Sequence, residues 1–270
     1  MKLALIPPTS LLGDTRKTSM QMMLPGPILD RDTEYIHCYR RHCHNPDQYV
    51  ILDNGAAERK QISHDMLFDM AANWRPNELV LPDFLADGPA TLKASETFIQ
   101  HQEVESLINM GVKLAFVVQG RDEDHAFETL EIFSVTWWAQ HIKVLHFPRL
   151  LITPQAPEAR LRTIIKAEEL LGNKFEYHML GANTLWPGEI KYASHIPYIR
   201  SMDTSAPYYM AHWQRPLDAA DKIWEAPLER PSNYFIRNKT AYLGSDFYVR
   251  TFLAWAEGRE PSATPSTSKV

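Results

Sequence analysis

The sequence predicts one α/β domain built as a (β/α)8 barrel, a TIM-like fold. From residue 49 onward, short apolar runs alternate with amphipathic helical stretches, which is typical of parallel βα units. Several of these runs end in a polar residue, and the strands of such barrels carry their chemistry at their C-terminal ends. The chain has 270 residues, 44% of them hydrophobic, which is enough for one barrel core. A doubly wound nucleotide-binding sheet is disfavoured, because neither GxGxxG nor GxxxxGKS/T follows the first apolar run.

The predicted strands are apolar runs that end at a turn residue or a polar group. They are residues 2–8, 49–55, 78–84, 113–120, 141–148, 175–182 and 198–205, and NYFIRN at residues 233–238 is the candidate for an eighth strand. Apolar residues at helical spacing predict helices between these runs. The helices cover residues 63–74, 90–110, 122–139, 154–172, 187–194 and 245–257.

Two stretches fit no regular element. Residues 9–47 show no clear period and are rich in Met, Pro, Arg and His. We expect a substrate-facing segment there, since long connections of this kind are usually functional or partly helical. Residues 259–270, REPSATPSTSKV, have the composition of a disordered tail, so the barrel domain is expected to span residues 1–258.

Composition narrows the class of protein. The net charge of -5 does not indicate a nucleic-acid binder, although local clusters rather than the sum set the field near a groove. No apolar run approaches the roughly 20 residues of a membrane helix, and the start, MKLALIPPTS, lacks the long apolar region of a signal peptide. Two cysteines without such a signal predict a reducing, cytoplasmic location and no disulfide.

Asp203 and Asp53 each follow an apolar run at a predicted strand end. If both face the mouth of the barrel, one carboxylate attacks an electrophilic carbon while the other transfers protons. Each aspartate is also suited to cap the helix or turn that follows it. The convergence of four polar strand ends, those of Asp53, Asp83, Gln119 and Asp203, favours the catalytic interpretation.

Asp83 and Gln119 have the chemistry to read a purine base. A carboxylate accepts two hydrogen bonds from the N1–H and 2-amino groups of guanine, and a glutamine offers both a donor and an acceptor. Gly120 would let the backbone approach a ligand closely. Asp87 is an alternative carboxylate, but it fits a solvated turn before Gly88 better. For Gln119 the competing interpretation is a structural amide that ties two loops together.

The cluster HCYRRHCH, residues 37–44, contains side chains that can bind zinc. Its C-x4-C-H spacing matches no tight ligand pattern, so a loop with incidental thiols is the better interpretation. Arg40 and Arg41 in this cluster are candidate phosphate contacts, and Arg237 with Lys239 in FIRNKT are a second pair. An ordinary solvated surface is the competing interpretation for all four.

Five short motifs occur in order along the chain: LDNGAAE, LPDF, FVVQG, HMLGAN and SMDTSAP. Together they resemble the motif series of the tRNA-guanine transglycosylase superfamily, a (β/α)8 barrel, and the similarity spans most of residues 49–244. The resemblance implies two sets of roles, catalytic for Asp53 as general acid/base and Asp203 as covalent nucleophile, and base-binding for Asp83, Gln119, Gly120 and Gly181.

The sequence departs from the tRNA-acting members in two places. No cysteine follows Cys43, so it lacks the C-x-C-x-x-C…H zinc motif that in that family supports tRNA docking. The family's Gly-Gly-Leu strand is replaced by VLHFP at residues 144–148. A short chain with the catalytic set and no zinc motif resembles the DNA branch found in phages and bacteria. Members of that branch exchange guanine in DNA for a 7-deazaguanine derivative.

The resemblance implies a pentosyltransferase whose partners are DNA, with its target guanine extruded, and a free 7-deazaguanine base. It implies no cofactor, because exchange of one N-glycoside for another is nearly balanced in energy. Three alternatives stay open at this point. They are exchange on tRNA with a queuine- or preQ-type base, hydrolysis of the N-glycosidic bond, and a non-catalytic partner subunit.

Overall fold

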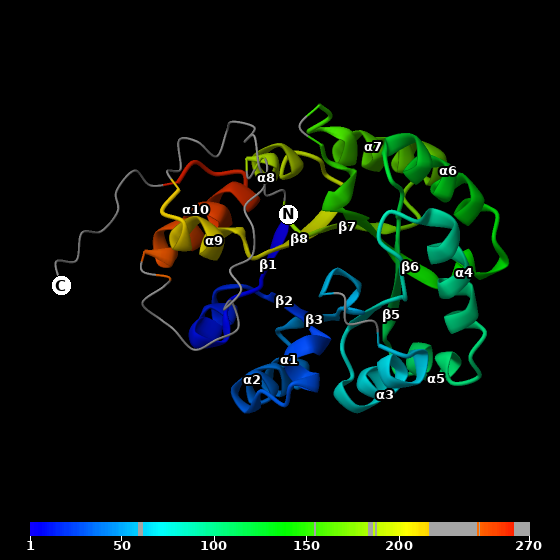
Figure 1. Cartoon of the computed structure of the whole chain (residues 1–270), viewed down its shortest axis with the longest axis horizontal. Helices are drawn as coiled ribbons and strands as arrows, with labels where there is room; N and C mark the ends of the chain where they lie inside the picture. The colour runs from blue at the N-terminus through cyan, green and yellow to red at the C-terminus, as the bar shows by residue number, and fades with distance from the viewer. Residues whose placement is uncertain are drawn as a thin grey trace.

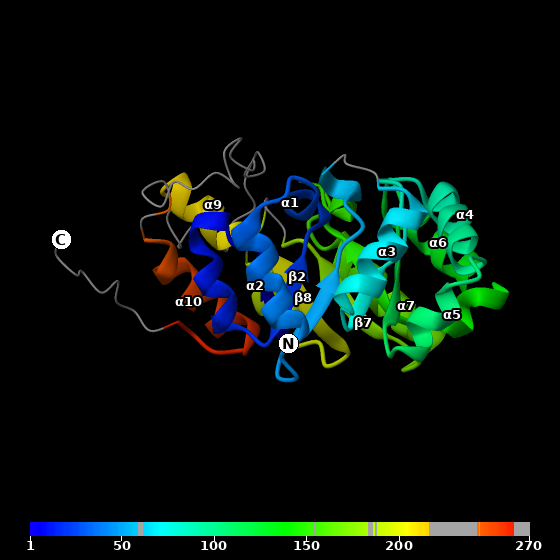
Figure 2. The same ribbon diagram turned by 90° about the horizontal axis from the view of Figure 1, so that it is seen from below.

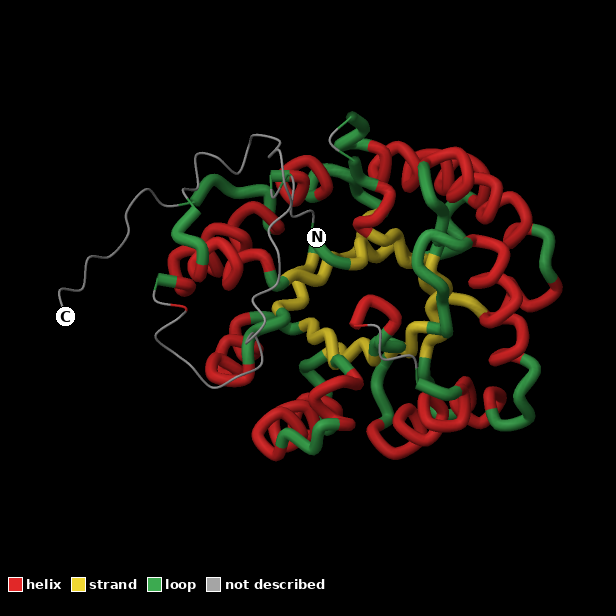
Figure 3. The backbone as a smooth tube through the Cα atoms, viewed as in Figure 1, coloured by secondary structure: helices red, strands yellow, loops and turns green. Residues whose placement is uncertain are grey.

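The computed structural model describes residues 1–58, 62–153, 155–182, 186, 188–215, 242 and 244–261. Within these residues, parallel strands β1 to β8 form a closed barrel, and helices surround it (Figure 1). The strands follow chain order around the ring, and β8 pairs with β1 to close it. Figure 3 shows the strands as an inner ring enclosed by helices. The predicted fold class is confirmed.

The strands fall on the predicted apolar runs, with one exception. They are β1 (Lys2–Leu5), β2 (Met20–Met23), β3 (Tyr49–Leu52), β4 (Glu78–Val80), β5 (Lys113–Val117), β6 (Ile142–Pro148), β7 (Glu176–Leu180) and β8 (Ile199–Thr204). Most are shorter than the predicted runs, because pairing stops where the chain turns away at the rim. Asp53 and Asp83 therefore lie just beyond the last residue of β3 and β4, in the loops that leave the barrel.

The strand that sequence analysis missed is β2. The predicted substrate-facing segment, residues 9–47, contains a 3-10 helix η1 (Thr9–Lys17), the strand β2, and the helices α1 (Pro25–Leu29) and α2 (Thr33–Cys43). The four residues of β2, MQMM, are all buried, so they show no apolar–polar alternation. NYFIRN, the predicted eighth strand, lies outside the described residues, and the ring is complete without it.

The outer helices include those that the sequence predicts, with changed boundaries, and one helix directly after β8 that it does not predict. They are α3 (His64–Trp74), α4 (Gly88–Ile99), α5 (Val104–Asn109), α6 (Glu123–Ser134), α7 (Ala159–Leu171), α8 (Glu189–Ala193), α9 (Ala206–His212) and α10 (Ser245–Ala256). The helix predicted over residues 90–110 is two helices, because the chain turns at residues 100–103. Asp87 caps α4, where its Oδ1 accepts from the N–H of Ala90 at 2.9 Å.

The helix α10 covers the seam where the barrel closes. It packs against α8, α9 and β1, and Figure 2 shows it at one end of the molecule next to the N-terminal 3-10 helix. An exposed ion pair of 2.8 Å between Lys17 of η1 and Asp246 of α10 joins the two elements. No helix in the described ranges is long and apolar enough to span a bilayer.

Candidate active site at the mouth of the barrel

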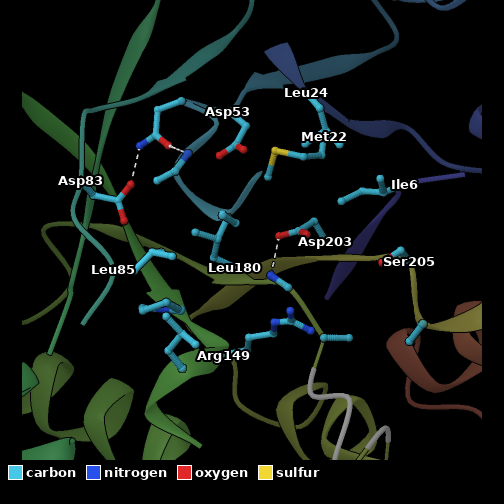
Figure 4. A pocket seen from close by; sticks show the side chains of 18 of the residues that line it. Ile6, Met22, Leu24, Asp53, Asp83, Leu85, Arg149, Leu180, Asp203 and Ser205 are labelled. Carbon is cyan, nitrogen blue, oxygen red and sulfur yellow. Dashed lines mark hydrogen bonds between the residues drawn. The ribbon is translucent and has the colours of Figure 1, made fainter. Parts of the chain in front are cut away.

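A pocket opens at the C-terminal ends of the strands, and every strand of the barrel or the loop that follows it contributes to its lining (Figure 4). Its volume is about 160 Å³. Three carboxylates predicted from separate strand ends, those of Asp53, Asp83 and Asp203, line it. The mouth of the barrel therefore carries the concentration of acidic groups that the strand-end pattern predicts.

Within the described residues, Asp203, near the end of β8, has one carboxylate oxygen that accepts hydrogen bonds and one that does not. Oδ1 accepts a hydrogen bond from the N–H of Gly181 at 2.7 Å and lies 3.0 Å from Nε2 of His178. Oδ2 makes no hydrogen bond to any residue that the structure describes, and the side chain lines the pocket. A carboxylate oriented in this way presents a single oxygen to a reacting carbon.

The N–H of Gly181 is fixed by a buried ion pair behind it. Arg160 of α7 pairs with Glu189 of α8, and its Nη1 donates to the carbonyl oxygens of Leu180 at 3.2 Å and Gly181 at 2.6 Å. The side chains of Arg160 and Glu189 are 0% and 1% exposed. Gly181 has a φ of +73°, in the left-handed region that favours glycine. The ion pair therefore anchors the turn that positions Asp203.

Asp83 is held by two side-chain amides. Asn54 Nδ2 donates to its Oδ1 at 2.6 Å, and Gln119 Nε2 donates to its Oδ2 in a short hydrogen bond. Gln119 Oε1 accepts from the N–H of Ala86 at 3.0 Å, so Gln119 ties the β4–α4 loop to β5 as well as lining the pocket. Burial raises the pKa of Asp83 above its usual value, against the lowering effect of the two amides. Each carboxylate oxygen keeps a further acceptor position for a ligand.

Asp53 reaches the pocket from the end of β3. Its N–H donates to the carbonyl oxygen of Met23 at 2.9 Å, and its Oδ2 accepts from the N–H of Gly55 at 3.3 Å. Figure 4 shows Asp53 and Asp203 at the same pocket, on different parts of its wall. Two carboxylates arranged in this way can divide nucleophilic attack and proton transfer between them.

Gly120 packs against α6 and is not among the residues that line the pocket. A Cβ at this position would lie 2.4 Å from the backbone nitrogen of Ala126, so only glycine fits. The glycine lets the first turn of α6 approach the end of β5. Its position supports a packing role in place of the base-binding role that the resemblance implies.

Of the basic residues predicted to contact phosphate, the two that the structure describes, Arg40 and Arg41, do not line the pocket. Arg40 and Arg41 lie in the last turn of α2, which leads into the N-terminal end of β3, so they occupy the opposite end of the barrel. Arg237 and Lys239 lie outside the described residues. Arg149, in the short 3-10 helix that follows β6, does line the pocket. It comes one residue after Pro148, the last residue of β6, and a slightly wider reading of strand ends would have found it.

In the histidine and cysteine cluster at residues 37–44, residues 37–43 form the C-terminal part of α2 and His44 is its C-cap, so the cluster is not a loop. Cys38 and Cys43 are free thiols, and Nε2 of His42 lies 2.8 Å from Oγ1 of Thr15. Within the described parts of the chain, no group of His, Cys, Asp or Glu side chains is arranged to hold a metal ion.

A chain of buried polar side chains runs through the barrel interior beneath the pocket. Glu78 accepts from Nε2 of His146 at 2.6 Å and from Nη1 of Arg200 at 2.8 Å. The ring of His146 lies against that of His178, with centroids 4.4 Å apart, and His178 contacts Asp203. Glu78 and both histidines are fully buried. The strand-end pattern does not predict them, because they lie at the start of or inside the apolar runs and not at their C-terminal ends.

Arg200 joins this chain because of a bulge in β8. Two consecutive residues of β7, Tyr177 and His178, pair with Ile199 and Ser201, which leaves Arg200 as the extra residue. A bulge re-aims the side chain that it carries. Neighbouring residues of a regular strand face opposite sides. Because of the bulge, the guanidinium of Arg200 reaches the carboxylate of Glu78 in the barrel interior, the side that Ser201 also faces.

Burial and neighbouring charges set the ionisation of this chain. Burial lowers the pKa of His178 to about 4, with a further lowering from His146 and an opposing effect of Asp203. His178 is therefore neutral at pH 7. Burial alone would raise the pKa of Glu78, but Arg200 and His146 hold it well below its usual range.

We expect His178 to make the folded protein less stable as the pH falls below 6.5. The unfolded chain protonates this imidazole at its ordinary pKa of 6.5 and the folded protein only near 4, so acid favours the unfolded state in that window. Between pH 7 and pH 5 the loss amounts to about 2 kcal/mol. Urea unfolding at both pH values, compared between the wild type and His178→Gln, isolates this contribution. An identical pH dependence in the two proteins would contradict it.

The pocket brings together five residues that sequence analysis proposed, Asp53, Asp83, Gln119, Gly181 and Asp203. The structure adds three that it missed, namely Asn54, Arg149 and His178. Comparison with known proteins gives no further assignment: no family model matches the sequence, and a search of curated proteins found no match.

Proposed function

We propose that the protein is a DNA-guanine transglycosylase, which exchanges guanine in DNA for a 7-deazaguanine derivative through a covalent aspartyl-deoxyribosyl intermediate. The setting of Asp203 carries this proposal. Its Oδ1 is held at 2.7 Å and 3.0 Å by Gly181 and His178, and its Oδ2 is left for a substrate in a pocket with two further carboxylates. Such a carboxylate can attack a sugar carbon and later leave it. The motif resemblance supplies the class of substrate.

The left wall of the pocket in Figure 4, around Asp83, suits the edge of a guanine. The target base must leave the duplex stack, because its glycosidic carbon is inaccessible within it. Asp83 then accepts from the N1–H and 2-amino groups, since Asn54 and Gln119 occupy only part of its acceptor capacity. Met22 and Leu180 supply apolar surface for the faces of the base. Recognition thus depends on a carboxylate that the protein holds rigid before the base arrives.

The exchange runs in two halves. In the first, Oδ2 of Asp203 bonds to C1′, the bond from C1′ to N9 of guanine breaks, and the departing base takes its electron pair and a proton from Asp53. In the second, N9 of the 7-deazaguanine bonds to C1′, its proton passes to Asp53, and the electron pair of the C1′–Oδ2 bond returns to Asp203. Two inversions give net retention at C1′, as in retaining glycosidases.

DNA is preferred to tRNA as substrate on the grounds of sequence. The zinc motif that supports tRNA docking in the resembling family requires cysteines after the nucleophile strand, and none follows Cys43. With a net charge of -5, the protein as a whole has little electrostatic attraction for the phosphate backbone of a nucleic acid. Arg149 at the pocket is the cation we expect to meet the phosphate next to the extruded base.

Mass spectrometry of nucleosides tests the proposal directly. DNA and tRNA are incubated separately with the purified protein and a panel of 7-deazaguanines, then digested. We expect a deazaguanine deoxynucleoside with DNA and an equal amount of released guanine. Incorporation into tRNA alone would show that the substrate is tRNA and not DNA. Guanine release without incorporation would show that the reaction is hydrolysis. The absence of all three products over the whole panel would refute the proposed function.

A further inference from the structure

We propose that His178 is a positioning residue for the nucleophile, held as a hydrogen-bond donor to Asp203 by a one-directional chain that begins at Arg200 and passes through Ser201. This inference deepens the proposed function, since it assigns the control of the Asp203 carboxylate in both halves of the exchange. The chain itself is a property of the folded protein and can be tested without any substrate.

The direction of the chain follows from the chemistry of its first member. A guanidinium only donates, and Nε of Arg200 lies 3.0 Å from Oγ of Ser201. Ser201 therefore accepts from Arg200. If Nδ1 of His178, at 2.8 Å, also donated to this hydroxyl, the hydroxyl proton would have no acceptor among the described residues and an unprotonated Nε2 would face the carboxylate of Asp203. Nδ1 must then be the acceptor, so the imidazole proton is on Nε2, 3.0 Å from Oδ1 of Asp203.

The imidazole stays in this state because a second proton is unfavourable. His178 is 0% exposed, and burial together with the adjacent ring of His146 lowers its pKa to about 4. At neutral pH the ring therefore carries one proton, and the hydroxyl of Ser201 places it on the side of Asp203. The bulge at Arg200 is what brings Arg200 and Ser201 to the same side of β8.

The contacts of Asp203 have a specific chemical consequence. Oδ1 receives two donors, from Gly181 and His178, so Oδ2 is the oxygen that bonds to C1′. In the covalent intermediate Oδ1 becomes an ester carbonyl oxygen, which is a weaker acceptor than a carboxylate. The donor from His178 therefore stabilises free Asp203 more than the ester, and it favours the departure of Asp203 from C1′ in the second half.

Nuclear magnetic resonance of histidine-labelled protein tests the chain without substrate. We expect His178, identified by the signal that His178→Gln removes, to be neutral with its proton on Nε2. The same tautomer should persist in Asp203→Asn, because Ser201 still fixes Nδ1 as the acceptor, and should give way to a mixture when Ser201→Ala is added. A proton on Nδ1 in the wild type, or loss of the Nε2 form in Asp203→Asn alone, would overturn the chain.

A pair of variants at His178 tests the effect on the nucleophile. His178→Gln keeps an N–H donor, whereas the similarly sized His178→Leu removes it. The protein is incubated with DNA at a fixed concentration of free guanine and without a 7-deazaguanine. The ratio of covalent adduct to free enzyme should rise about tenfold in His178→Leu, since a hydrogen bond that stabilises the free carboxylate is lost. The ratio should stay near the wild-type value in His178→Gln and in Thr251→Val, which removes a buried hydroxyl in α10.

The two measurements separate the failure of this inference from the failure of the proposed function. Equal adduct ratios in the Gln and Leu variants would overturn the positioning role while leaving the exchange reaction intact. A wild-type protein that forms no adduct with DNA or tRNA would refute the exchange reaction, and the resonance experiment would then decide the inference by itself.

Discussion

Asp203→Asn abolishes base exchange, with an expected loss of about 10⁴-fold or more in the single-turnover rate. An amide nitrogen cannot form the bond to C1′ that Oδ2 forms, so the covalent route is closed rather than slowed. The amide oxygen still accepts from Gly181 and His178, which leaves the packing of β8 unchanged. The melting temperature should therefore stay close to that of the wild type.

The matched control for this variant is Asp87→Asn. Asp87 also carries a carboxylate in a loop after a strand, but it caps α4 and does not line the pocket. Asparagine caps helices as well as aspartate does, so this variant should keep full activity. Intact mass must show that the amide introduced by Asp203→Asn has not deamidated back to a carboxylate. Normal exchange by the verified Asp203→Asn protein would remove Asp203 as the nucleophile.

Arg160→Met is expected to cost about 3–5 kcal/mol of the free energy of unfolding. The substitution leaves the carboxylate of Glu189 buried without its cation, and the carbonyl oxygens of Leu180 and Gly181 lose their donor. For a chain of this size the melting temperature should fall by about 10 °C. Thermal and urea unfolding both report the change.

Arg162→Met is the control for this second variant. Arg162 lies two residues further along α7 and also pairs with a glutamate, Glu123, but its side chain is 46% exposed. An exposed pair of this kind contributes at most about 1 kcal/mol. Equal destabilisation by the two substitutions would show that burial of the Arg160 pair is not what makes it important.

The strand-end pattern predicted the site better than it predicted the scaffold around it. Asp53, Asp83 and Asp203 follow short, mostly apolar runs, and closure of a parallel barrel brings such positions to one rim. The strand β2 gave no signal, because four buried residues that include Gln21 show neither alternation nor a hydrophobic run. The side-chain nitrogen of Gln21 donates to the carbonyl oxygen of Thr15 and to Oε1 of Gln48, and the second of these contacts joins segments that a local pattern does not compare.

The positions of cations followed no such rule. Arg40 and Arg41 were selected because they are adjacent and basic, yet their place on α2 puts them at the wrong end of the barrel. The buried polar side chains inside the barrel were not predicted for a related reason. A histidine within an apolar run is compatible with either face of a strand, and only the pairing of β6, β7 and β8 shows that His146 and His178 meet inside.

The pairing of β8 with β1 joins residues that are about two hundred positions apart in sequence, Lys2 with Ser201 and Ala4 with Asp203. Contacts of such high sequence separation form slowly, because loop-closure entropy must be overcome before they contribute stability. Asp203, the proposed nucleophile, thus belongs to the pairing with the highest contact order in the ring. During synthesis, Asp53, Asp83 and Gln119 emerge from the ribosome well before Asp203. A nascent chain therefore places the carboxylate of Asp203 in the pocket only as the ring closes.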